Sequence, residues 1–254
     1  MFTTDEQRRL EALTLSFIDG HRWEAARGFT ITDEMRVLIA AQACVLALGF
    51  REEIEQGIDL YSKVSSIIVH PSTLVMSGQR STGTQGVMAD GPYALLGEAH
   101  MRGPVLISWA AASSDAGHPR RGRNVVIHEF AHQLDMLDGI VDGTPPIADE
   151  ATHARWVEVC TREFQALRAG TSSPILDQYG ATDHGEFFAV ASELLFTRPA
   201  EMHSELPDLY QVISGFYRQD LAARFTTAPF TSTSFTSGPV RRPDHIGGTN
   251  PSAT

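Results

Sequence analysis

Two histidines and a glutamate, His128, Glu129 and His132, form an H-E-x-x-H pattern inside the apolar helical run 125–139. On an α-helix, residues four apart project from the same side, one turn apart. Two imidazoles so placed can bind one Zn²⁺ ion through nitrogen, at about 2.0–2.1 Å. Glu129 follows the first histidine, where its carboxylate could take a proton from a water on the metal. The spacing predicts a zinc hydrolase site with one Zn²⁺ per chain.

The residues around this pattern argue against a chance match. Burying charged or polar groups costs on the order of a few kcal/mol each unless they are paired or ligated. A bound metal would offset that cost, and nothing else in the segment obviously does. Apolar residues surround the polar trio and predict a helix packed into a core: Val125, Val126, Ile127, Phe130, Ala131 and Leu134.

A catalytic zinc site needs a third protein ligand, and the sequence offers two candidates. Asp138 lies ten residues after the first histidine, where some H-E-x-x-H proteases carry their last ligand. Those proteases turn the chain sharply with a glycine where this chain has Asp135, and Asp suits such a turn poorly. Glu186 instead opens an apolar helical pattern at 184–197. We expect Glu186 to complete a gluzincin-type site, with Glu193 behind it or in solvent.

Several segments together resemble the Mlc titration factor A family of zinc peptidases. The likeness runs from about residue 15 to 225, and it is carried by Asn124–Asp135, Gly103–Trp109, Glu186–Glu193 and Phe216–Asp220. The site is also similar to that of the anthrax lethal factor catalytic domain, which has an H-E-F-x-H helix and a later E-F-F-A helix.

The resemblance implies a zinc-dependent peptidase, with aminopeptidase-like action as one form. It also implies a link to sugar uptake through a transcriptional repressor of the Mlc type. It places zinc on His128, His132 and Glu186, with Glu129 as the base. Tyr179 would donate a hydrogen bond to the oxyanion, although read alone it would be a packed loop aromatic. The competing hypothesis is a non-catalytic protein that sequesters the repressor, and the intact Glu129 favours catalysis.

Two further residues near the pattern are candidates for supporting roles. Asp135 lies three residues beyond His132 and could accept the second ring N–H of a ligating histidine, which would fix its tautomer. His184 lies two residues before Glu186, at the expected start of the second helix.

Composition bounds the class of protein. With 254 residues and 42% hydrophobic content, we expect one zincin-like domain at 1–228, with a helical part at 1–60 and a disordered tail at 229–254. The net charge of −11 argues against partners such as nucleic acid or an anionic membrane but says little about the substrate, which the resemblance implies is a peptide or protein. Cys44 and Cys160 are expected to be buried free thiols. With no signal peptide or apolar run of about 18 residues in view, the expected location is cytoplasmic.

The elements that must position the site form an α+β pattern. Helices are expected at 4–19, 33–49 with Thr32 as N-cap, 150–168, 184–197 and 206–224. Strands are expected at 66–70, 73–76 and 104–109, with a Gly/Ser/Thr-rich connection at 77–86. The pattern predicts a zincin-like fold in which a small mixed sheet precedes the metal helix.

The strand within Gly103–Trp109 has two interpretations. In zincins, an edge strand near the metal helix binds extended peptide through its main chain. Pro104 cannot donate to a ladder, which fits a strand start or an edge. An ordinary internal strand is equally compatible with the sequence. The polar stretch 111–122 is expected to be a connection, either a movable loop over the cleft or a solvated linker.

Overall fold

The computed structural model describes residues 2–26, 28–55, 59–72, 74–81, 88–95, 97–99 and 103–226 of the chain. The tail expected at 229–254 lies outside the described residues. In chain order the helices and strands are α1 (Thr4–Gly20), β1 (Trp23–Ala25), α2 (Asp33–Ala47), α3 (Arg51–Glu55), β2 (Ile67–His70), β3 (Leu74–Ser81), β4 (Met88–Leu95), β5 (Gly97–Ala99), β6 (Val105–Ser108), α4 (Trp109–Gly117), η1 (Pro119–Arg121), α5 (Val125–Asp135), η2 (Met136–Asp138), α6 (Glu150–Arg168), η3 (Gln178–Ala181), α7 (His184–Thr197), α8 (Pro199–Glu205), α9 (Pro207–Tyr217) and α10 (Ala223–Thr226).

The long helices begin where their capping residues predict. Thr3 caps α1 in a reciprocal box with Glu6, in which each side chain accepts from the other residue's backbone N–H. Thr32 caps α2, as expected from the sequence. The expected helices at 150–168 and 184–197 correspond to α6 and α7.

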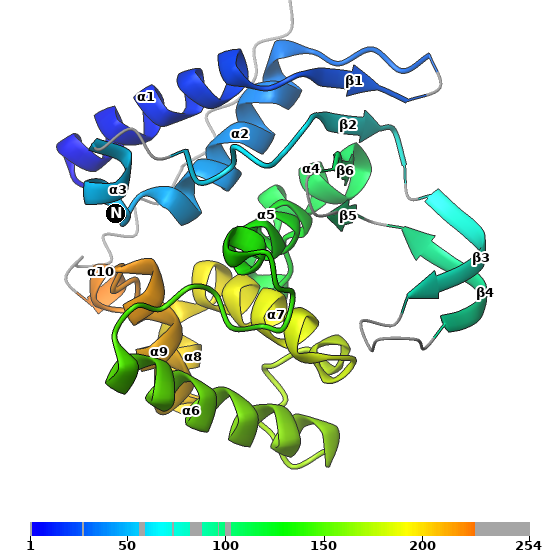
Figure 1. The fold of residues 1–254 in the computed structure, drawn as a ribbon. Helices are drawn as coiled ribbons and strands as arrows, with labels where there is room; N and C mark the ends of the chain where they lie inside the picture. The colour runs from blue at the N-terminus through cyan, green and yellow to red at the C-terminus, as the bar shows by residue number, and fades with distance from the viewer. Residues whose placement is uncertain are drawn as a thin grey trace, which may run out of the picture.

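The sheet is small and mixed. Its strand order is β1-β2-β6-β5, in which β1, β2 and β6 run parallel and β5 runs antiparallel to β6. Strands β3 and β4 pair with each other as a separate antiparallel ribbon, which stands to one side of the helices in Figure 1. The described residues combine many helices with this small sheet, so the predicted α+β class is confirmed.

The structure corrects the peptide-edge interpretation of the segment Gly103–Trp109. Strand β6 lies inside the sheet, between β2 and β5, so the internal-strand interpretation holds; the two edges are β1 and β5. Strand β5 contacts α5, the helix that carries the H-E-x-x-H pattern.

The prediction of a loop or linker at 111–122 is also wrong, because α4 and η1 occupy most of this stretch. The Oγ of Ser108 accepts from the N–H of Ala111 and so starts a helix immediately after the strand.

Two other expected boundaries differ from the structure. The helix expected at 206–224 begins at Pro207 as α9 but ends at Tyr217, because Arg218 adopts a left-handed conformation with φ 52°. The short α10 follows separately. Strand β3 runs to Ser81, into part of the connection expected at 77–86. The short elements β1, α3, β5 and α8 have too few residues to show a period in the sequence.

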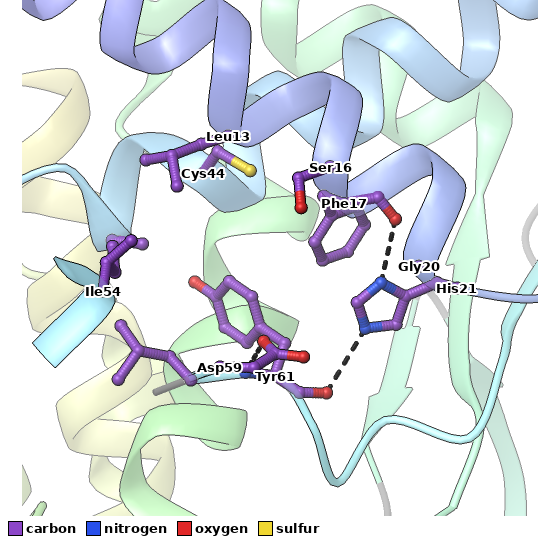
Figure 2. A pocket seen from close by; sticks show the side chains of 11 residues that line it. Leu13, Ser16, Phe17, Gly20, His21, Cys44, Ile54, Asp59 and Tyr61 are labelled. Carbon is purple, nitrogen blue, oxygen red and sulfur yellow. Dashed lines mark hydrogen bonds between the residues drawn. The ribbon is translucent and has the colours of Figure 1, made fainter. Parts of the chain in front are cut away.

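An aromatic cluster supports the buried face of α5. The ring of Phe130 on α5 lies 5.5 Å from that of Phe17 on α1 and 5.0 Å from that of Tyr61, measured between centroids. Phe17 and Tyr61 also line a cavity of about 270 Å³ between α1 and α2 (Figure 2). The hydroxyl of Tyr61 donates to the carbonyl of Ala43 at 2.8 Å. This cluster fixes the rotation of α5 about its axis, and therefore which residues α5 presents on its other side.

Both cysteines are as expected. Cys44 and Cys160 are buried, free thiols, and burial raises the pKa of each to about 12.

None of the helices in the described ranges combines the length and apolar character that crossing a membrane requires.

The loop after α5 depends on a glycine, which gives a first prediction. Gly143 has φ +75°, and a Cβ there would lie 2.1 Å from the carbonyl oxygen of His184. Gly170 has φ +70° but nothing within 4 Å of its Cβ position. Alanine costs about 1–2 kcal/mol at either position for its left-handed backbone, and only at Gly143 must the backbone also move. Gly143→Ala should lower the melting temperature by several degrees more than the control Gly170→Ala. Equal losses would contradict the packing described for this loop.

Candidate metal centre

Helix α5 presents the two histidines of the H-E-x-x-H pattern side by side. Asn124 caps the helix, because its side-chain oxygen accepts from the backbone N–H groups of Val126 and Ile127 at 3.1 Å each. His128 and His132 lie one turn apart, with ring centroids 4.9 Å apart and their Nε2 atoms 3.2 Å apart. Both side chains are partly buried, so the two ring nitrogens meet in a site with limited access to water.

Helix α7 brings Glu186 to the same point. Asp183 caps this helix by accepting from the backbone N–H of Glu186 at 2.9 Å. The Oε2 atom of Glu186 lies 3.0 Å from Nε2 of His128 and 3.5 Å from Nε2 of His132. Together these residues form a group that could hold a metal ion.

The spacing of these three atoms fits zinc. Ligands at 2.0–2.1 Å in a tetrahedral site lie about 3.3–3.4 Å from one another. The three separations here, 3.0, 3.2 and 3.5 Å, lie on either side of that value. Two imidazoles and one carboxylate also form a donor set typical of catalytic zinc, which leaves a further coordination position open.

The electrostatics of the group favour a positive charge at its centre. Burial opposes protonation of His128, but hydrogen bonds to Glu186 and Glu193 outweigh it and hold the pKa well above its usual range. Burial would raise the pKa of Glu186, yet the hydrogen bonds from His128 and His132 lower it strongly. A proton or a metal ion can supply the charge that these groups require.

The sequence left open whether Glu193 lies behind the metal ligands or in solvent. In the structure it lies directly behind His128. Its Oε1 accepts from Nδ1 of His128 at 2.8 Å, and its Oε2 accepts from the backbone N–H of Asn124. The side chain is buried, which excludes the solvated alternative. Since a carboxylate on Nδ1 fixes the ring orientation, Nε2 is directed at the group formed with Glu186. Asp115 of α4 satisfies the neighbouring N–H, that of Val125, at 3.0 Å.

Glu129 lies beside the histidines and is almost fully buried. Its Oε2 atom has no hydrogen-bond partner among the residues that the structure describes, and its side chain is about 4% exposed. Burial raises the pKa of its carboxyl to about 7, against the opposing effect of His128 and His132. A buried carboxylate oxygen without a donor is a place where a water molecule would gain a hydrogen bond.

Tyr179 reaches the group from η3. Its hydroxyl donates to Oε1 of Glu186 at 3.2 Å, and its ring lies 6.0 Å from that of His128. The side chain of Asp177 accepts from the backbone N–H of Tyr179 at 3.0 Å and pairs with Arg123 at 2.6 Å. Arg123 directly precedes the cap of α5, so this ion pair joins η3 to the start of the metal helix. Sequence reasoning missed the pair, because no pattern connects residues 54 apart in the chain.

The expectation that Asp135 accepts from a ligating histidine is wrong. Asp135 is fully buried, but its Oδ2 accepts from the backbone N–H of Gly143 at 3.0 Å. Its Oδ1 has no partner in the described part of the chain. Burial raises the pKa of this carboxyl to about 7. The position behind His128 belongs to Glu193, which comes from a different helix.

Two other candidate residues lie outside the group. Asp138 is exposed and accepts from the backbone N–H of Ile140 at 2.9 Å, in the turn that Gly139 ends with φ +97°. Its carboxylate therefore serves the turn that ends the helix. His184 is exposed and packs on Phe164, with ring centroids 4.2 Å apart.

Comparison with known proteins places this geometry in context. The sequence profile of a family described as glucose-regulated metallo-peptidase M90 matches residues 1–218. An uncharacterized protein of Synechocystis, slr2042, is 33% identical over 217 residues, which cover 84% of this chain and 76% of the relative. Proteins named Mlc titration factor A from Salmonella gallinarum and Salmonella typhi are 31% identical over 229 residues, covering 87% of this chain and 82% of each relative.

The double role of Glu193 gives a second prediction. Glu193→Ala leaves the backbone N–H of Asn124 and Nδ1 of His128 without their buried acceptor, which should lower the free energy of unfolding by about 1–3 kcal/mol. Denaturant unfolding of chelator-treated protein measures this loss without any contribution from a metal. Glu11→Ala on the exposed side of α1 is the matched control and should change little. If both variants unfold like the original protein, Glu193 does not hold the start of α5.

Proposed function

The chain belongs to the glucose-regulated metallo-peptidase M90 family, and we propose that it hydrolyses peptide bonds with a zinc-activated water. The observation that supports this most strongly is the triangle of His128, His132 and Glu186, whose spacing suits zinc, beside the buried carboxylate of Glu129. A structural zinc site has no need of a base and is usually closed by four protein ligands. Three ligands and a base are the parts that hydrolysis requires.

The proposal gives each residue of the group a role. His128, His132 and Glu186 would hold the ion. When bound, zinc would polarise the scissile carbonyl and lower the pKa of water toward about 7. Glu193 would keep the proton of His128 on Nδ1, so that the lone pair of Nε2 stays available to bind the metal. Because Glu193 is fixed by the backbone of α5, the orientation of His128 is set before any substrate arrives.

Glu129 and Tyr179 would carry the proton transfer and the oxyanion. The Oε2 of Glu129, which has no hydrogen-bond partner among the described residues, suits a base that takes a proton from water and returns it to the leaving amine. Tyr179 is about 44% exposed and already within hydrogen-bond distance of Glu186, so its hydroxyl could turn toward a substrate carbonyl. A donor in this role contributes about 3–4 kcal/mol in well-studied cases.

We further propose that an extended peptide pairs with β5. This strand is one edge of the sheet and contacts α5, the helix that carries the two histidines, so a peptide paired with it would run near the proposed metal site. Peptides with free and blocked amino termini would separate aminopeptidase from endopeptidase action. An aminopeptidase cleaves only the free form.

A regulatory role is the alternative, and the names of the Salmonella relatives favour it. We propose a repressor of the Mlc type as partner, and the cytoplasm as the location in which the free thiols of Cys44 and Cys160 would stay reduced. Sequestration of a repressor would require no base at Glu129. Catalysis and sequestration therefore make different demands on one residue.

Glu129→Gln tests the proposed function. The variant should bind zinc like the original protein, because Glu129 is no ligand, while peptide hydrolysis falls by about 10²–10⁴-fold. Zinc content and a peptide-library cleavage assay, with and without chelator, are the measurements. Glu11→Gln, an exposed change far along the chain, should keep full activity. Near-normal hydrolysis by zinc-loaded Glu129→Gln would remove Glu129 from the mechanism. An original protein that binds zinc and a repressor but cleaves no peptide would favour sequestration.

A further inference from the structure

A second cavity, of about 350 Å³, lies where the residues before α5 meet the segment before η3. None of the three proposed metal ligands belongs to its wall. The cavity is nevertheless close to the proposed catalytic group, because Asp177 in its wall also accepts from the backbone N–H of Tyr179. The wall consists of Arg121, Gly122, Arg123, Pro174, Ile175, Asp177 and Arg198.

The charge of this wall is opposite to that of the protein. The chain carries a net charge of −11, yet three guanidinium groups and one carboxylate line the cavity. A second carboxylate, that of Glu201, lies outside the wall and pairs with Nη2 of Arg198. Glu205 also acts on Arg198 from outside the wall, and the nearby Arg120 acts on Glu201, so four arginines face three carboxylates and leave one positive charge in excess. Such a local excess on an acidic protein attracts anions.

The hydrogen-bonding capacity of these arginines is only partly used. Arg123 is committed to Asp177, whose Oδ2 lies 2.8 Å from its Nε and 2.6 Å from its Nη2. Arg121 makes one long contact, 3.4 Å from its Nη1 to Oγ of Ser114. The Nε of Arg198 is buried and has no acceptor in the part of the chain that the structure describes. A buried charged donor without an acceptor is unfavourable, so a ligand that accepts hydrogen bonds would be stabilised here.

Gly122 forms the part of the cavity wall between Arg121 and Arg123. It ends η1 in a left-handed conformation with φ +76°. A Cβ at this position would lie 3.4 Å from Cδ of Arg198, an ordinary contact, so the left-handed backbone rather than lack of space favours glycine here. The planar fork of a guanidinium group matches the paired oxygens of a carboxylate or a phosphate.

We propose that this cavity binds a carboxylate or phosphate group through Arg121 and Arg198, with Arg123 as a fixed positive charge held by Asp177. Two sources can supply that group. One is a small phosphorylated molecule or free phosphate. The other is an acidic side chain of the peptide substrate, and only this source rests on the proposed peptidase function.

Binding of inorganic phosphate to the zinc-loaded full-length chain tests the site directly. The backbone amide NMR signal of Gly122 reports the cavity, and that of Gly185 reports the metal centre. Phosphate should shift the Gly122 signal saturably. Arg121→Gln and Arg198→Lys should each weaken this binding about 10-fold or more, as loss of a charged hydrogen bond does. Arg120→Gln removes the same charge from a neighbouring arginine outside the wall and should weaken the binding much less.

The same experiment can overturn the proposal. No saturable shift at Gly122, equal affinity in Arg121→Gln and Arg120→Gln, or a shift at Gly185 alone would each contradict it. Peptides that differ only in Glu or Gln near the cleaved bond then identify the source. A KM that rises in Arg121→Gln for the Glu peptide alone indicates a substrate side chain, and unchanged KM values indicate a free anion. If the chain cleaves no peptide, the phosphate titration still decides whether the site exists.

Discussion

The packing of α5 against α7 brings ionisable side chains together where water is scarce, and this constrains the rest of the structure. His128 lies between the carboxylates of Glu186 and Glu193, at 3.0 and 2.8 Å. Isolated charges in such a place are strongly unfavourable, and they persist only when they are paired, hydrogen-bonded or bound to a metal. Glu186 and Glu193 each accept a hydrogen bond from His128, and the Nε2 atoms of His128 and His132 lie 3.2 Å apart. The two helices therefore cannot slide or rotate without separating these partners.

The remaining elements hold the two helices in that relation. The backbone N–H groups at the start of α5 donate to side chains on three segments: Asn124 itself, Asp115 on α4 and Glu193 on α7. The aromatic cluster around Phe130 supports the opposite face. At the other end of α5, Asp135 accepts a hydrogen bond from the backbone N–H of Gly143. Gly143 in turn packs closely against the backbone of His184, at the beginning of α7. An exposed ion pair such as Arg123–Asp177 contributes little stability by itself. Its importance lies in position, since it connects the start of α5 with the turn that carries Tyr179.

The sequence was sufficient wherever local patterns decide the structure. The histidine spacing, the apolar periods of α6 and α7, and Thr32 as a cap are local, and each is confirmed in the structure. Two features depended on distant contacts. The sequence offered Glu193 as a residue behind the ligands or in solvent, but could not decide between these or pair it with His128, 65 residues away, and it gave no sign that β5 is the sheet edge beside α5. Around residues 109–117, Ser108 as a cap and four alanines outweighed the polar character that suggested a connection.

The proposed metal ion would be held by two residues of α5 and one of α7. Metal content per chain, measured after purification and zinc loading, tests it most directly in Glu186→Ala and Asp138→Ala. Glu186 lies within 3.5 Å of both histidine nitrogens, whereas Asp138 is exposed and serves a turn. The account predicts about one zinc per chain in Asp138→Ala and a large loss of zinc in Glu186→Ala. Retention of zinc by Glu186→Ala together with its loss from Asp138→Ala would contradict the account.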